Sequence, residues 1–107
     1  MEEKKRRGLT YEAETKLDLL KRHIHVLRII QDKGAMSMLK LSELTGYPLH
    51  VARYSLRMLE REGLIKPSSQ GAVATNVINK GIPQLKNKLK EMNKTINDIM
   101  EAFSFEK

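Results

Sequence analysis

A run of basic and aromatic side chains in the middle of the sequence carries hydrogen-bond donors and rings that could bind a ligand. Its members recur at helical spacing: His50, Arg53, Tyr54, Arg57 and Arg61. The guanidinium group of arginine is a planar fork of hydrogen-bond donors, and it fits paired acceptors such as the O6 and N7 edge of guanine. Residues four apart share one face of a helix, so the arginines can meet one groove of a nucleic acid. The alternative is a solvated face on which Arg57 and Arg61 pair with Glu60 or Glu62.

The turn before this run carries a second group of polar side chains: Ser42, Thr45 and Tyr47. Hydroxyl and amide groups at the start of a helix bind phosphate, although Ser42 and Thr45 suit ordinary capping at least as well. Two roles are open for Tyr54, since it can stack or bond to phosphate, or cover the edge of the core with its ring. We find no nucleophile with a base, phosphate loop or paired carboxylates, and therefore do not expect an enzyme.

Two helical patterns precede the basic run and must help to position it. Apolar residues three or four apart predict a helix over 11–33, and Gly34 is expected to end it in a left-handed conformation. Ser37 is placed to cap a short second helix, because its hydroxyl can accept from amides two or three residues further on. Leu41 and Leu44 are the predicted inner face of that helix.

A turn at Gly46 leads into the third helix. Pro48 suits the first turn, where its missing amide hydrogen would have no partner, and we expect this helix over about 48–62. Short apolar runs then flank a turn-forming segment, which predicts a hairpin, or wing, over about 64–76. The polar candidates on the wing are Lys66, Ser68, Ser69 and Gln70. This order of elements predicts a mainly α fold with a small β-hairpin, the winged helix-turn-helix.

A long final helix is expected after the wing. Asn79 is its predicted cap, Pro83 lies near its predicted start, and it should run to about residue 103. Its apolar residues follow strict three-four spacing: Ile82, Leu85, Leu89, Met92, Ile96, Ile99 and Phe103. This is the period of a coiled-coil seam, so we expect the long N- and C-terminal helices to form a homodimer interface. The alternative is that the stripe packs back on its own domain.

Composition narrows the class of partner. The chain has 107 residues, a formal net charge of +7 and a pI near 9.8, which favour one domain and a polyanionic partner. The absence of cysteine excludes thiol catalysis and thiolate metal sites. His23 and His25 are two apart and point to different helix faces, so we expect no metal and no cofactor. Without a signal-type or membrane-spanning segment, we expect a cytoplasmic protein that does not enter membranes.

Three features resemble the winged-helix transcriptional regulators of the MarR and ArsR type found in bacteria and archaea. The first is LSELTGYPLHVARYSLRMLEREGLI, in which Ala52, Leu56 and Leu59 precede a Gly-Leu-Ile exit. The second is VINKGIPQL, with Asn79 in the usual place of a capping Thr or Ser. The third is the pair of long terminal helical segments, which is similar to the dimer-forming arms of such proteins. The short wing departs from the family pattern because it carries a single charged residue.

The resemblance implies a homodimeric, sequence-specific DNA-binding transcriptional regulator. The helix over about 48–62 would lie in the major groove and the wing over about 64–76 on the backbone. We expect three segments, namely a basic, flexible N-terminal arm over 1–10, the winged helix-turn-helix DNA-binding domain over 11–79 and a C-terminal dimerisation helix over 80–107. In the arm, the basic run from Lys4 to Arg7 either reaches along DNA or only solubilises the terminus.

A different interpretation is a winged-helix protein-interaction module within a larger complex, because a fold does not fix its function. The apolar stripe of the final helix would then bind another chain. The first interpretation predicts double-stranded DNA and a second copy of the chain as partners. Neither interpretation specifies a small-molecule effector.

Overall fold

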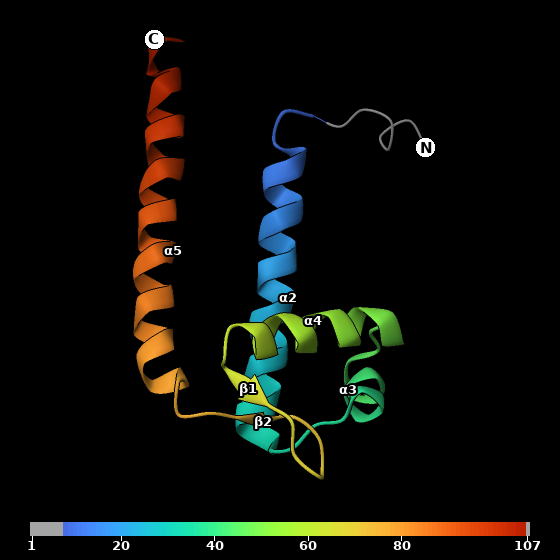
Figure 1. Ribbon diagram of the computed structural model, residues 1–107. Coiled ribbons are helices and arrows are strands. Elements are labelled where there is room, and N and C mark those ends of the chain that lie inside the picture. The colour runs from blue at the N-terminus through green and yellow to red at the C-terminus, as the bar shows by residue number, and fades with distance from the viewer. Residues whose placement is uncertain (1–7, 107) are drawn as a thin grey trace. The chain divides into compact units, whose positions relative to one another are not determined.

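The computed structural model describes residues 8–106 of the chain. Its elements in chain order are α2 (Tyr11–Lys33), α3 (Met38–Thr45), α4 (Leu49–Arg61), β1 (Ile65–Lys66), β2 (Val73–Ala74), α5 (Ile78–Glu101) and the 3-10 helix η1 (Ala102–Glu106). A mainly helical winged helix-turn-helix with a small antiparallel hairpin is therefore confirmed (Figure 1). Internal contacts divide the chain after Thr75 into two units, which we describe separately.

Helix α2 has an exposed first half and a buried second half. The side chains of residues 11–18 are exposed. The buried side chains come later in the helix: His23, Val26, Leu27 and Ile30. Gly34 ends the helix by donating its amide to the Ile30 carbonyl at 2.9 Å, with φ 90° and ψ −156°. The positive φ agrees with our prediction, but the ψ angle is not that of a left-handed helical cap, because the chain extends from here towards the hairpin.

A tight turn joins α3 to α4. Ser37 caps α3 as predicted, since its hydroxyl accepts from the amide of Lys40 at 3.1 Å. Gly46 ends α3 in the left-handed conformation with φ 80° and ψ 0°. Pro48 is the N-cap of α4 rather than a residue of its first turn, and its carbonyl accepts from the amide of Ala52 at 3.0 Å. The fixed φ of proline thus sets the direction in which α4 leaves the turn.

The core of the first unit lies where its three helices and the hairpin meet. Its buried apolar side chains are Val26, Leu27, Ile30, Met36, Leu41, Ala52, Leu59 and Ile65. Leu41 is 0% exposed, but Leu44 is 50% exposed, so the prediction that both line the inner face of α3 is wrong for Leu44. Helix α3 has eight residues and packs mainly on α4, which covers only a narrow stripe of it.

The hairpin is joined to the segment between α2 and α3. Strands β1 and β2 pair antiparallel, with Ile65 opposite Ala74. Directly before β2, Ala72 exchanges two backbone hydrogen bonds of 2.9 and 3.0 Å with Met36. The wing is therefore anchored on both sides, by α4 through the chain and by Met36 through this bridge.

Helix α5 and η1 form the second unit. Helix α5 begins at Ile78 with Val77 as its N-cap, so the prediction that Asn79 caps it is wrong. The amide of Asn79 already donates to the Asn76 carbonyl at 3.1 Å, which places Asn79 inside the first turn. Pro83 also lies within the helix rather than at its start. The helix continues because proline removes one amide donor close to the N-terminus, while the rest of the 24-residue ladder is intact.

Gly71 is the hairpin glycine that a side chain would disturb most. Its φ is 120°, and a Cβ at this position would lie 2.6 Å from the carbonyl carbon of Met36 and 2.7 Å from the amide nitrogen of Ser37. We predict that Gly71→Ala lowers the free energy of unfolding by about 2 to 4 kcal/mol, because the unfavourable φ and the forced separation of two backbones add. Urea denaturation followed by circular dichroism measures this loss.

Gly46→Ala is the matched control, since its φ of 80° is also unfavourable for alanine but nothing lies within 4 Å of the added Cβ. We expect this variant to lose about 1 kcal/mol. Equal losses in the two variants would show that the close backbone approach at Gly71 contributes nothing.

Candidate nucleic-acid interface

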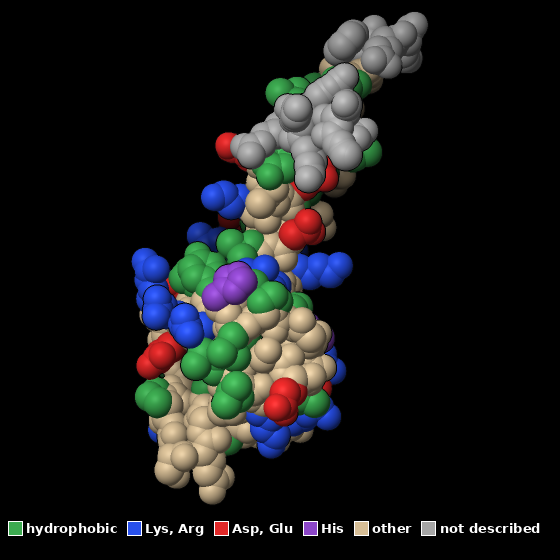
Figure 2. All heavy atoms as spheres, turned by 90° about the vertical axis from the view of Figure 1, so that its right-hand side faces the viewer, with side chains coloured by type: hydrophobic (Ala, Val, Ile, Leu, Met, Phe, Trp, Pro, Cys, Tyr) green, Lys and Arg blue, Asp and Glu red, His purple; other side chains and the backbone are tan. Residues whose placement is uncertain are grey.

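One face of α4 is basic and open to solvent. All five residues of the predicted set are exposed: His50, Arg53, Tyr54, Arg57 and Arg61. On the opposite side Ala52 and Ser55 are 0% exposed, so burial of that side determines which face α4 presents. Helix α4 crosses α2 and has the hairpin at its C-terminal end (Figure 1). Basic side chains gather along one edge of this domain, beside apolar side chains and a histidine (Figure 2).

The arginines of α4 have no carboxylate partner within residues 8–106. The ion pair that the structure contains there joins Arg28 to Asp32 in α2, at 3.1 Å. Arg61 contacts the sulfur of Met58 at 3.7 Å, one turn back in the same helix. The alternative in which Arg57 and Arg61 pair with neighbouring glutamates is therefore not seen in the described chain. The guanidinium donors of α4 remain available to a ligand.

The hydroxyl groups of the turn bind the turn itself. Ser42 Oγ donates to the carbonyl of Tyr47 at 2.6 Å. Thr45 Oγ1 donates to the carbonyl of Leu41 at 2.8 Å and accepts from the amide of Tyr47 at 3.1 Å. A hydroxyl has one proton and a phosphate oxygen only accepts, so neither side chain can donate to phosphate without releasing the turn. Tyr47, whose ring stands edge-on to that of His25 at 6.2 Å, keeps its phenol as a donor.

The polar side chains of the wing also fall into two groups, one that bonds within the wing and one that is exposed. Ser68 Oγ donates to the carbonyl of Gly71 at 2.6 Å and accepts from the amide of Gln70 at 3.2 Å, which closes the tip. Lys66, Ser69 and Gln70 are exposed. Their side chains are the ones on the wing that can meet a ligand.

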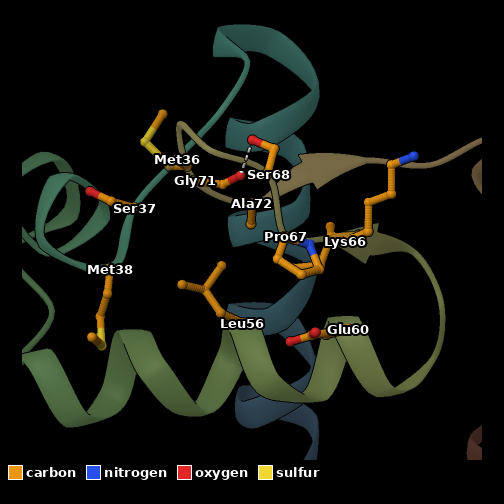
Figure 3. Close-up of a pocket in the computed structure, with 11 residues that line it drawn as sticks. Met36, Ser37, Met38, Leu56, Glu60, Lys66, Pro67, Ser68, Gly71 and Ala72 are labelled. Atoms are coloured by element: carbon orange, nitrogen blue, oxygen red, sulfur yellow. Dashed lines mark hydrogen bonds between the residues drawn. The ribbon is translucent and has the colours of Figure 1, made fainter.

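A small groove separates the wing from α4. It has a volume of about 210 Å³. Its lining includes Glu60 from α4, Lys66 from β1 and the apolar side chains of Met36, Met38, Leu56 and Pro67 (Figure 3). Sites for small organic ligands usually occupy about 300 to 1,000 Å³. The groove is below that range, so we regard it as the joint between wing and helix rather than an effector site.

A polar contact between α2 and α4 was missed by the sequence analysis. His23 Nδ1 and Ser55 Oγ share a hydrogen bond of 2.8 Å, and Arg22 Nε donates to the same Oγ at 3.4 Å. The His23 ring also lies 5.6 Å from the ring of Tyr54. The available signal was the position of Ser55, which falls on the buried side of the helical pattern. Tyr54 covers the edge of the core, since its ring contacts the buried histidine, while the residue remains 42% exposed.

Burial gives His23 an unusual titration. It lowers the pKa of this imidazole below its ordinary value of 6.5, and the positive charge of Arg22 lowers it further. Its Nε2 atom is buried without a hydrogen-bond partner among the described residues. An imidazolium would leave that N–H unsolvated, so His23 is neutral in the folded protein at neutral pH.

The apolar stripe of α5 is exposed over most of its length. Ile82 and Leu85 are half-buried. The remaining members are 37 to 55% exposed: Leu89, Met92, Ile96, Ile99 and Phe103. The basic run from Lys4 to Arg7 lies outside the described residues.

Residues 8–106 contain neither a metal-binding cluster nor a membrane-spanning helix. No group of three or more His, Asp or Glu side chains is arranged to hold a metal ion there. None of the described helices has the length and apolar character that a membrane crossing requires.

Comparison with protein families gives one match. Residues 19–66 fit a family model described as winged helix-turn-helix DNA-binding. The match covers the second half of α2, the helix-turn-helix and β1, which includes every α4 residue of the candidate interface. No curated protein sequence matches the chain. The match supports double-stranded DNA as a partner.

The neutral state of His23 makes stability depend on pH. Because its folded pKa is lowered, the unfolded chain binds the proton more readily, and we predict that the free energy of unfolding falls as the pH drops below about 6.5. Urea denaturation between pH 7.5 and 5 measures this slope. His23→Gln should flatten it, whereas His25→Gln, at an exposed position of the same helix, should keep it. A slope unchanged by His23→Gln would contradict the prediction.

Proposed function

We propose that this protein is a homodimeric, sequence-specific DNA-binding transcriptional regulator. The observation that carries the proposal is the exposed face of α4, whose arginines lack carboxylate partners in the described chain and lie within the matched segment. A polyanion supplies the missing acceptors, and its binding releases counterions. The net charge of +7 favours the same partner. In this proposal α4 enters the major groove and the wing follows the backbone.

Arg53 and Arg57 are assigned to base recognition. They are one turn apart, about 6 Å along the helix axis, which lets each reach a different base pair. A bidentate arginine–guanine contact contributes about 1 to 3 kcal/mol of discrimination against a wrong base. Arg61 near the end of α4 and Lys66 on β1 are assigned to backbone phosphates, since phosphate contacts orient a protein without reading sequence.

The homodimer is assigned to α5. A palindromic operator is read by two copies of one recognition helix, so the regulator needs a dimer. The exposed stripe from Leu89 to Ile99 offers an apolar surface at coiled-coil spacing. Full burial of each aliphatic side chain contributes about 1.5 to 3 kcal/mol, so four of them can support a stable dimer.

A second candidate function follows from the same exposed stripe. If α5 binds a different chain, the protein is a winged-helix interaction module within a larger complex. The two candidates differ in the oligomeric state of the purified protein.

We predict that Arg53→Ala and Arg57→Ala each weaken binding to a selected operator about 10-fold or more, while binding to random DNA changes far less. Lys66→Ala should weaken both alike and reduce the slope of log affinity against log salt by about 1. Fluorescence anisotropy with operator and random duplexes at several salt concentrations measures all three variants. The operator is obtained by selecting bound fragments from random DNA.

Arg28→Ala is the control, since this arginine belongs to α2 and pairs with Asp32. It should leave both affinities nearly unchanged. Equal losses on operator and random DNA for Arg53→Ala and Arg57→Ala would move base recognition to another part of the surface.

We predict that the wild-type protein sediments as a dimer and that Ile96→Asp dissociates it, because the substitution puts a charge into the centre of the apolar stripe. Asn97→Asp adds the same charge one position away, outside the stripe, and should leave the dimer intact. Sedimentation velocity over a concentration series measures both effects. A monomeric wild-type protein would overturn the homodimer and favour the interaction module.

A further inference from the structure

Charge is distributed unevenly along α5. Residues 78–90 contain four lysines and no carboxylate: Lys80, Lys86, Lys88 and Lys90. Residues 91–104 contain three carboxylates and one lysine: Glu91, Asp98, Glu101 and Lys94. The first half of the helix is strongly positive and the second half is negative.

The helix macrodipole adds to this asymmetry. The N-terminus of a helix carries a partial positive charge and the C-terminus a partial negative charge. The first turn of α5 contains no acidic residue and the last turn no basic residue, so side chains oppose the dipole at neither end. Both ends therefore keep charge of the sign that the dipole already has. A helix with the same distribution, running in the opposite direction, is complementary to it.

We propose that the apolar stripe of α5 binds α5 of a second copy in antiparallel orientation, about a two-fold axis near Lys94. This inference rests on the proposed homodimer and adds the direction and register of its helices. The antiparallel orientation sets the positive half of each α5 against the negative half of its partner. A parallel orientation would instead bring the four lysines of both copies together along about 15 Å of helix.

The apolar spacing accommodates this register. With the axis near Lys94, Leu89 lies opposite the partner's Ile99, and Met92 lies opposite the partner's Ile96. These four side chains are 37 to 55% exposed in the single chain. In heptad terms Lys88 then falls on the same side of the seam as the partner's Asp98, where opposite charges attract.

The antiparallel orientation has a consequence for DNA. The DNA-binding unit is attached at the N-terminal end of α5, so the two attachment points lie at opposite ends of the helix pair. In the proposed register they are about 48 Å apart along the axis. This exceeds the roughly 34 Å between successive major grooves on one side of DNA.

Spin-label distances test the orientation without altering the seam. The chain has no cysteine, so each introduced cysteine gives one labelled site per copy. Asn87→Cys, Lys94→Cys and Glu101→Cys are seven residues apart at exposed positions on the helix face away from the stripe. Double electron–electron resonance measures the distance between the two labels of each dimer. We expect the shortest distance at position 94, and longer distances at 87 and 101 because an axial offset of about 21 Å is added there.

The other outcomes are distinct. Equal distances at all three positions indicate a parallel pair and overturn the inference while leaving the homodimer intact. Equal distances at 87 and 94 with a longer one at 101 indicate a seam shifted by one heptad and overturn the axis near Lys94. A labelled protein that sediments as a monomer overturns the homodimer itself.

Disulfide formation between Leu89→Cys and Ile99→Cys is the second measurement. In the proposed register each variant alone stays unlinked, because its own copies are about 15 Å apart, and the mixture of the two variants links. Linking of each variant with itself, and none in the mixture, would overturn the antiparallel orientation. The charge-reversed variant Lys88→Glu should reduce linking in the mixture, and adding Asp98→Lys should restore it.

Discussion

The candidate interface depends on one constraint, the fixed packing of α4 on α2. Ala52 and Ser55 have no exposed surface, and such small side chains allow the two helices to approach closely. Apolar contacts are non-directional and would tolerate rotation of α4 about its axis. The 2.8 Å hydrogen bond between His23 and Ser55 is directional and does not. The direction in which the arginines point is therefore fixed by the buried hydrogen bond that Ser55, on the opposite side of α4, forms with His23 of α2.

Polar residues near the interface separate into two groups by whether their side-chain donors already have an acceptor in the described chain. Ser42, Thr45 and Ser68 donate to backbone carbonyls and shape the turn and the wing tip. Arg53 and Arg57 donate to nothing that the described chain provides. This difference distinguishes residues that position the surface from residues that can bind a partner, although all of them lie close together in the sequence. Residue type alone does not make that distinction, because a serine suits both roles equally well.

The order of elements was predictable because it depends on local signals. Apolar spacing, the Ser37 cap and the left-handed Gly46 each act within a few residues. The errors arose where the deciding interaction is distant or competes with another signal. Leu44 was expected on the inner face of α3, but α4, which follows later in the chain, covers only a narrow stripe of that helix and leaves Leu44 50% exposed. Asn79 was expected to cap α5, but carbonyls before it accept the first amides, so the helix starts earlier.

The candidate site was predictable in its composition but not in its support. The exposed face of α4 follows from helical periodicity, because the residues between the arginines are those that must be buried. The pairing of His23 with Ser55 depends on how two helices cross, and spacing within either helix carries no information about it. The hydroxyl protons of the turn were also undetermined, since their acceptors are set by the exact path of the backbone.

The unpaired arginines of α4 lower the stability of the free domain by a small amount. Like charges four residues apart on a helix destabilise it by about 0.2 to 0.5 kcal/mol for each pair, so the pairs formed by Arg53, Arg57 and Arg61 oppose folding by about 1 kcal/mol or less. Each bidentate contact to a base contributes more than that in discrimination alone. Ion pairs with the neighbouring glutamates would offset the repulsion, but they would have to break before a polyanion could bind. Leaving the arginines unpaired therefore exchanges a small loss of stability for donors that need no rearrangement, and a neutral His23 in α2 avoids placing a further positive charge against α4.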